Sequence, residues 1–148
     1  MKLITIKKSN MLDLNQELTA NFTLKEFLLA EFYSEEQQQR VLDSVTPEIL
    51  CGIQELSNNL QILRNELGVP ITVNIGFRPV WWELFRERSG TSQHCFGFAA
   101  DIYVEGVHPH TVHKLLNELM LSGAIQNGGL GKYNTFTHYD IRLEMARW

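Results

Sequence analysis

The chain has 148 residues, of which 44% are hydrophobic and 20% charged, and these values are typical of one globular domain with one core. The net charge of −4 argues against a broad nucleic-acid-binding surface, and no apolar run is long enough to span a bilayer. The N-terminal segment lacks the apolar region of a secretory signal, so we expect synthesis in the cytoplasm without the usual export route. Cys51 and Cys95 form no close pair, and a disulfide framework is not indicated.

Two helix starts stand out in the first half of the chain. Residues 23–26, Thr-Leu-Lys-Glu, form a capping box and predict a short helix. Thr46 followed by Pro47 is the second start. Leucine and isoleucine then recur at helical spacing until Gly68 ends the run, which predicts the main core helix over residues 47–67.

Shorter elements alternate in the second half. The apolar runs predict strands at residues 71–75, 98–104 and 137–143, and a helix between Pro109 and Gly123. Residues 76–90 read as irregular, and the glycine-rich segment 128–131 reads as a turn. Helices that precede and interleave with a few strands indicate a small α+β fold. We expect a single domain over residues 1–148, with residues 1–21 as an N-terminal extension and 22–148 as the core.

Two polar patterns point to chemistry. Residues 91–102, TSQHCFGFAADI, place His94 and Asp101 seven positions apart with mostly small and apolar residues between them. In the last predicted strand, side-chain alternation puts His138, Asp140 and Arg142 on one face. Three polar residues alone would more often form a solvated sheet surface. The two patterns together, however, supply two histidines and an aspartate that could meet at one site.

Two imidazoles and one carboxylate form a complete protein ligand set for a catalytic zinc, with a fourth position left for water. Zinc bound in this way lowers the pKa of that water toward ~7. His94, Asp101 and His138 could supply the set. Asp140 lies two residues from His138 on the same strand face, so it could accept a proton beside the metal without binding it.

Four segments carry a resemblance to a known family. SQHCFGFAADI resembles the S-x-H-x-x-G-x-A-x-D signature of the zinc D-Ala-D-Ala carboxypeptidase-like peptidases, the M15 group, and FTHYDIRLEMARW resembles their closing H-x-D-x-R segment. VNIGFRP is similar to the segment that precedes the first motif, and FTLKEF to the opening of small phage and bacterial members. The resemblance runs from about Phe22 to Trp148.

The resemblance implies a small antiparallel sheet flanked by helices, as in hedgehog and D-Ala-D-Ala peptidase domains. It also implies one zinc ion bound by His94, Asp101 and His138. Peptidases of this group cleave bonds next to D-amino acids in peptidoglycan stem peptides or cross-bridges. Those peptides are therefore the expected partners, and we expect a monomer that neither binds nucleic acid nor inserts into membranes.

The chain departs from the family pattern in two places. Ile75 and Phe77 stand where the family usually has serine and tyrosine. Some branches carry a glutamate, and others a histidine, shortly before the last metal ligand, and this chain has Thr135 and Phe136 there. Asp140 is our candidate for the general base, with Glu144 as a weaker one.

Several other residues could have either a functional or a structural role. Arg78 could bind a substrate carboxylate or the oxyanion of the intermediate, or it could hold its own loop. Ser92 could orient substrate or cap the turn, and Gln93 could contact substrate or lie in solvent. We expect Arg142 to form a structural ion pair near the site.

A second histidine group and a cysteine are better explained by structural roles than by chemistry. His108, His110 and His113 lack a carboxylate with matching spacing, so a solvated helix start is favoured over a metal site. Cys95 follows His94 directly, and neighbours in an extended segment point to opposite sides. We therefore interpret Cys95 as a small buried side chain rather than a nucleophile.

The sequence thus predicts a zinc metallopeptidase that acts on peptidoglycan, as a carboxypeptidase or an endopeptidase. Without a recognisable export signal, the expected setting is a phage lysin or a virion-associated enzyme. The alternative is a zinc-containing module that binds the cell wall, or serves in a virion, with little or no turnover.

Overall fold

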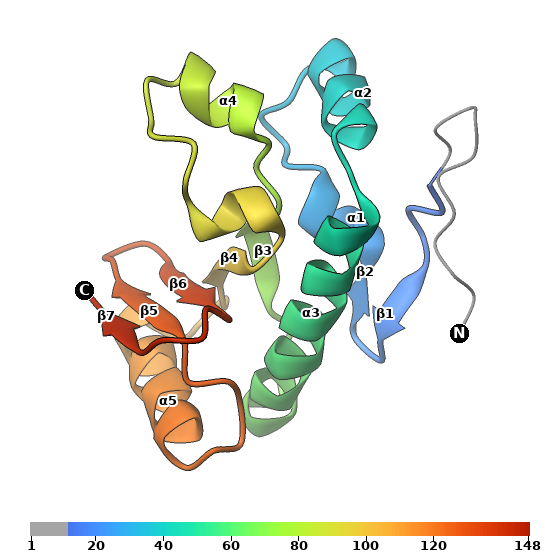
Figure 1. Ribbon diagram of the computed structural model, residues 1–148. Helices are drawn as coiled ribbons and strands as arrows, with labels where there is room; N and C mark the ends of the chain where they lie inside the picture. The colour runs from blue at the N-terminus through green and yellow to red at the C-terminus, as the bar shows by residue number, and fades with distance from the viewer. Residues whose placement is uncertain (1–11) are drawn as a thin grey trace.

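The structure is a computed structural model that describes residues 12–148 (Figure 1). The strands are β1 (Glu17–Thr19), β2 (Phe22–Thr23), β3 (Thr72–Ile75), β4 (Ala99–Tyr103), β5 (Gly129–Lys132), β6 (Thr137–Asp140) and β7 (Ala146–Arg147). The helices are α1 (Leu24–Leu28), α2 (Glu35–Asp43), α3 (Pro47–Leu67), α4 (Val80–Phe85) and α5 (Pro109–Leu121), with a 3-10 turn, η1 (Gln93–Phe96).

The strands form two sheets. β1 and β2 make a small antiparallel pair, and the other five strands follow the order β3-β4-β6-β5-β7. Neighbours in the larger sheet are antiparallel except β5 and β7, which are parallel. The predicted α+β fold is confirmed, but the main sheet is mixed rather than wholly antiparallel.

The long helix α3 has the boundaries that the sequence predicts. The Thr46 side chain accepts a hydrogen bond from the backbone N–H of Ile49, and Pro47 occupies the first turn. At the other end Gly68 adopts a left-handed φ of 70° and donates to the Arg64 carbonyl. The apolar side of α3 is buried in the core through Ile53, Leu56, Leu60 and Leu63.

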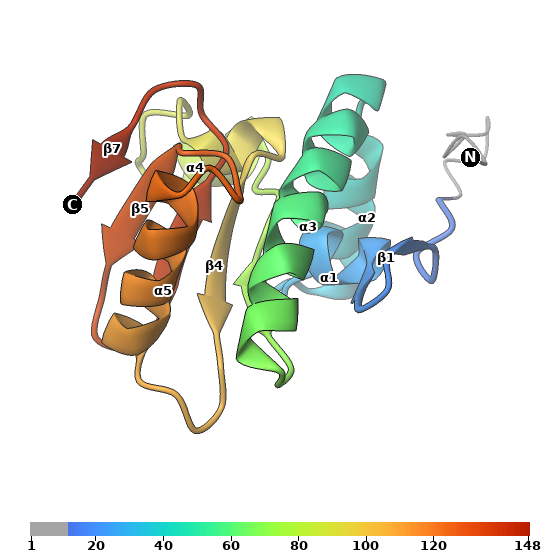
Figure 2. The same ribbon diagram turned by 90° about the horizontal axis from the view of Figure 1, so that it is seen from below.

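The main sheet separates the core from the polar pattern. Figure 2 shows α5 lying across one face of the sheet, beside α3. Tyr139 on β6 belongs to the hydrophobic core. Because side chains alternate along a strand, its neighbours His138 and Asp140 project from the opposite face. The candidate residues therefore lie on the sheet face away from α5.

Two helices depart from the sequence prediction. Helix α2 was not predicted because Val41 is its only fully buried residue, which leaves a weak apolar pattern. Its start is a capping box between Ser34 and Gln37. Helix α4 lies within residues 76–90, which were predicted to be irregular. Six residues are too few for a helical period to be recognised.

Two strands also differ from the prediction. Residues 128–131 were predicted to be a turn, but Gly129–Lys132 is strand β5, paired with both β6 and β7. The last long strand was predicted to reach residue 143, but β6 ends at Asp140. The Asp140 carboxylate accepts the backbone N–H of Arg142 at 3.2 Å, so this N–H pairs locally instead of with a neighbouring strand.

Residues 12–21 are the described part of the segment that we set apart as an N-terminal extension. They supply β1, which pairs with β2, and the side chain of Leu18 belongs to the core. Within the described residues, no helix combines the length and apolar character that crossing a membrane requires.

The burial of α3 predicts a clear contrast between two of its residues. Leu60 is fully buried, whereas Ile62 on the same helix is 37% exposed. Leu60→Ala should lower the free energy of unfolding by about 3 kcal/mol because it leaves a cavity in the core. Ile62→Ala is the matched control and should cost about 1 kcal/mol or less. Urea denaturation of both variants measures the difference, and equal losses would contradict this packing of α3.

Candidate metal centre

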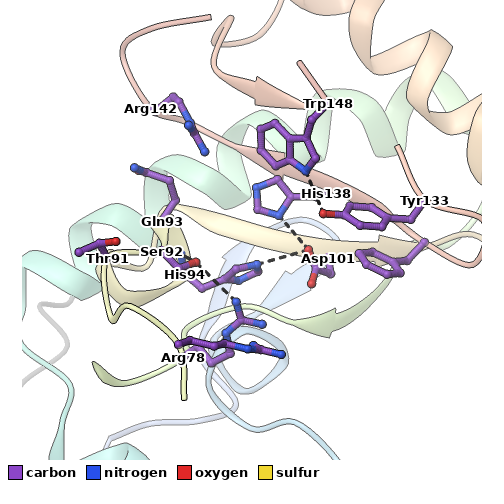
Figure 3. Close-up of a pocket in the computed structure, with 12 residues that line it drawn as sticks. Arg78, Thr91, Ser92, Gln93, His94, Asp101, Tyr133, His138, Arg142 and Trp148 are labelled. Atoms are coloured by element: carbon purple, nitrogen blue, oxygen red, sulfur yellow. Dashed lines mark hydrogen bonds and ion pairs between the residues drawn. The ribbon is translucent and has the colours of Figure 1, made fainter. Parts of the chain in front are cut away.

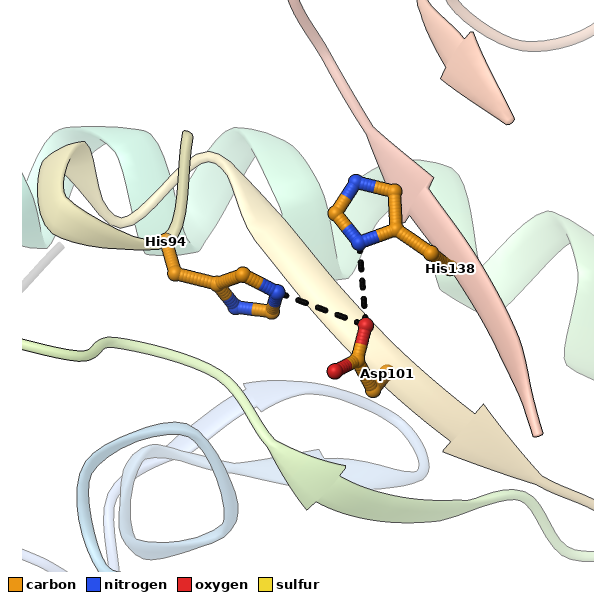
Figure 4. Close-up of side chains that lie close together, drawn as sticks. All are labelled: His94, Asp101 and His138. Atoms are coloured by element: carbon orange, nitrogen blue, oxygen red, sulfur yellow. Dashed lines mark hydrogen bonds and ion pairs between the residues drawn. The ribbon is translucent and has the colours of Figure 1, made fainter. Parts of the chain in front are cut away.

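Three side chains from separate segments meet on the open face of the main sheet (Figure 4). Asp101 on β4 and His138 on β6 are cross-strand partners, and His94 reaches them from η1. His138 Nδ1 lies 2.9 Å from Asp101 Oδ1, and His94 Nε2 lies 3.3 Å from the same oxygen. The three ligand atoms lie within 4.8 Å of one another, so the predicted grouping is present.

Hydrogen bonds on the far side of each ring orient both histidines. His94 Nδ1 lies 2.7 Å from the Gly76 carbonyl oxygen, which can only accept, so Nδ1 carries a proton and Nε2 is the ring nitrogen that faces the cluster. His138 Nε2 lies 2.8 Å from Asp140 Oδ2, which leaves Nδ1 as the ring nitrogen that faces Asp101 and the cluster. Such outer partners accompany metal-binding histidines. The donor set and its orientation therefore fit a zinc ion.

The electrostatics of the cluster follow from its contacts. Burial would raise the pKa of Asp101, but hydrogen bonds from His138 and His94 outweigh burial and hold that pKa below its usual range. Burial would lower the pKa of His138, but hydrogen bonds with Asp101 and Asp140 raise it above its usual value. Asp101 is therefore ionised at neutral pH, as a metal ligand must be.

Asp140 lies behind His138 and does not line the pocket. Its carboxylate is fully buried and accepts from His138 Nε2, from Nε and Nη2 of Arg142 at 2.8 and 2.7 Å, and from the Gly129 backbone N–H at 3.0 Å. Burial would raise its pKa, but the bonds from His138 and Arg142 keep it below its usual range. The expected ion pair of Arg142 is thus part of the support behind His138.

Glycines on β5 make room for this arrangement. Gly129 pairs with Asp140 and Gly131 pairs with His138 in the sheet. A Cβ on Gly129 would overlap the Asp140 carboxylate, and one on Gly131 would lie 2.7 Å from the Trp148 indole nitrogen. The glycines that suggested a turn are therefore there because other side chains pack closely against this strand.

A pocket of about 470 Å³ opens in front of the cluster (Figure 3). Three residues that the sequence selected, Arg78, Ser92 and Gln93, line it. The Ser92 hydroxyl accepts the His94 backbone N–H at 3.2 Å, and Arg78 Nη2 lies 3.5 Å from that hydroxyl. Ser92 thus caps the turn that carries His94 and also faces the pocket.

Three aromatic residues that were not predicted to contact substrate form another wall of the pocket: Tyr133, Phe136 and Trp148. The rings of Tyr133 and Phe136 stack at 4.3 Å, and Trp148 Nε1 donates to the Tyr133 hydroxyl at 2.8 Å. The Trp148 ring lies 5.0 Å from that of His138. The one available signal was the aromatic spacing around the last metal ligand, and a strand pattern does not show which of these rings face the site.

The remaining candidates lie outside the pocket. Glu144 is exposed and does not line it. His108 caps α5 by accepting the His110 backbone N–H at 3.1 Å, which agrees with a helix start. Cys95 is buried and forms no disulfide. Burial together with the nearby Glu83 carboxylate raises the pKa of its thiol, so a thiolate nucleophile is disfavoured.

The position of Asp140 leads to a test of its role. If it holds His138 in place, Asp140→Asn should weaken zinc affinity by about 10- to 100-fold. If it acts only as a proton acceptor, zinc affinity should stay unchanged while hydrolysis is lost. Competition with a chromogenic zinc chelator separates the two outcomes. Glu144→Gln, an exposed carboxylate at the same end of the sheet, is the control and should leave zinc affinity unchanged.

One family comparison agrees with the geometry. A model of the peptidase M15 family, described as "Peptidase M15", matches residues 20–140. The matched region contains the three residues of the cluster and Arg78. No curated protein matches the sequence. Because the match covers most of the 148 residues, the chain belongs to the peptidase M15 family.

Proposed function

We propose that the protein is a zinc-dependent peptidase that hydrolyses peptide bonds next to D-amino acids in bacterial peptidoglycan. The observation that supports this best is the cluster of His94, Asp101 and His138, in which each imidazole turns one ring nitrogen toward the Asp101 carboxylate and has a partner for the other. Membership of the peptidase M15 family supports a peptidase. Such a substrate would place its action at the cell wall, as in a phage lysin.

Zinc held by these three residues would supply Lewis-acid chemistry, polarising a scissile carbonyl and activating water. The protein's own groups would do the rest. Gly76 and Asp140 would accept from the outer ring nitrogen of each imidazole and leave the inner nitrogen for the metal. Arg78, whose side chain is 14% exposed and faces the pocket, is placed to bind negative charge on substrate or intermediate. Tyr133, Phe136 and Trp148 would shield one side of the site from water.

A specific observation favours a second candidate, a module that binds wall peptides with little turnover. Asp101 is the only carboxylate among the residues that line the described pocket. Phe136 lines the pocket at the position where some family branches have a second histidine. Asp140 is enclosed by its three partners, so we assign it to positioning His138. Slow proton transfer would follow from the absence of a free base.

Hydrolysis by the zinc-loaded protein is the direct test of the peptidase. Mass analysis of purified muropeptides should show products cut next to a D-amino acid, and removal of zinc by a chelator should stop their formation. His94→Ala should abolish cleavage and remove bound metal, because one ligand is lost. His110→Ala is the control and should change neither. Intact muropeptides after long incubation with the zinc-loaded wild type would exclude the enzyme.

The second candidate makes its own prediction at position 136. Phe136→His keeps a ring beside Tyr133 and adds a group that can accept a proton. If proton transfer limits a weak enzyme, this variant should cleave muropeptides about tenfold or more faster than wild type. Phe136→Leu, which adds no base, is the control. If cleavage falls equally in both variants, the missing base is not the limiting feature.

A further inference from the structure

A second group of charged residues adjoins the metal pocket and centres on Glu83. Glu83 on α4 is 1% exposed, and its two carboxylate oxygens lie 3.4 Å from Arg78 Nη2 and 3.2 Å from Arg88 Nη1. Both arginines line the pocket in front of the cluster. One buried carboxylate therefore holds two guanidinium groups at the same side of the pocket. Sequence reasoning selected Arg78 but neither Glu83 nor Arg88.

The backbone also brings Arg88 to this place. Glu87 has a left-handed φ of 58°, the only positive φ of a non-glycine residue within the described part of the chain. This turn lets the Arg88 backbone N–H donate to the Glu83 carbonyl at 2.8 Å. A non-glycine residue in this region costs about 1 kcal/mol or more. The unfavourable backbone conformation of Glu87 thus turns the chain so that Arg88 lies beside Glu83.

The charges here do not balance. Two guanidinium groups share one carboxylate, whereas Arg142 across the pocket has the Asp140 carboxylate as a close partner. Arg78 makes only long contacts, 3.4 Å to Glu83 and 3.5 Å to Ser92, and its buried Nε has no hydrogen-bond partner within the described residues. The Arg88 side chain is 47% exposed. Donors and one unit of positive charge remain for an anion.

Arg78 and Arg88 also lie at the boundary between the metal pocket and a second, neighbouring hollow. A neighbouring hollow of about 370 Å³ shares Arg78 and Arg88 with the metal pocket and is otherwise lined by Phe32, Ile75, Trp82 and Arg86. A peptide that ended at the arginines would leave its terminal carboxylate beside both guanidinium groups. A longer peptide would have to cross them without matching their charge. The geometry favours recognition of a chain end over recognition of a continuous chain.

We propose that Arg78 and Arg88, held together by Glu83, bind the free C-terminal carboxylate of the peptide substrate, and that Arg88 determines the preference for it. This inference rests on the proposed function in that the ligand is a peptide at the metal site. Glu83 is a positioning residue, since its carboxylate holds both guanidinium groups and lies 1% exposed beneath them. The arrangement corresponds to carboxypeptidase rather than endopeptidase specificity.

The test measures binding, so it does not depend on turnover. The probes are a ketomethylene analogue of N-acetyl-L-Lys-D-Ala-D-Ala, in which the scissile amide is replaced, and the C-terminal amide of that analogue. Calorimetry with the zinc-loaded wild type should show the acid binding about tenfold or more tightly than the amide, as expected for a charge-assisted guanidinium–carboxylate contact. Arg88→Ala should remove most of this preference, and Arg88→Lys should keep part of it.

Arg86→Ala is the matched control. Arg86 lies two residues away and lines the neighbouring hollow but not the metal pocket, so the preference for the acid should persist in this variant. Thermal unfolding of each zinc-loaded variant checks that the fold is intact. Equal affinity of the wild type for acid and amide, binding of neither, or an undiminished preference in a folded Arg88→Ala would overturn the proposal. A preference for the acid without hydrolysis of muropeptides would uphold it and reject only the peptidase.

Discussion

The buried carboxylate of Asp140 is the group around which the site is organised. It has no exposure to solvent, and an ionised carboxylate in such a place is tolerated only when its lone pairs are satisfied. His138, Arg142 and the Gly129 backbone satisfy them. The same contacts fix the ring of His138, end β6 and require glycine on the adjacent strand. The need to satisfy the buried Asp140 carboxylate therefore connects the C-terminal segment, through Arg142, to His138 of the candidate metal centre.

The support extends from this carboxylate in two directions. Arg142 also lies over the Trp148 ring at 5.3 Å, and Trp148 in turn contacts His138 and Tyr133. Strand β7 holds this segment in place by pairing with β5. On the other side of the pocket, Glu83 does for Arg78 and Arg88 what Asp140 does for His138 and Arg142. Two buried carboxylates thus orient most of the charged groups that face the pocket.

The sequence was most informative where a short local rule determines the structure. The capping residues and apolar period of α3 predicted its limits because helix ends depend on nearby residues. Alternation along β6 predicted that His138 and Asp140 share a face. Helices α2 and α4 and strand β5 were missed. The first has little buried surface, the second is short, and the third is glycine-rich because of side chains on other strands.

The sequence by itself determined the chemical type of the site, since two histidines and an aspartate in motifs of the M15 type form a donor set that could bind a metal once the sheet brings them together. Only the tertiary structure decided the roles around that set. It enclosed Asp140 behind His138, brought the aromatic rings of Tyr133, Phe136 and Trp148 to one wall, and placed Arg88 beside Arg78 on Glu83. These relations join residues far apart in the chain or on opposite sides of a turn. They depend on strand register and on the direction in which each side chain points. Neither of these can be derived from amino-acid composition or from the spacing of residues in the sequence.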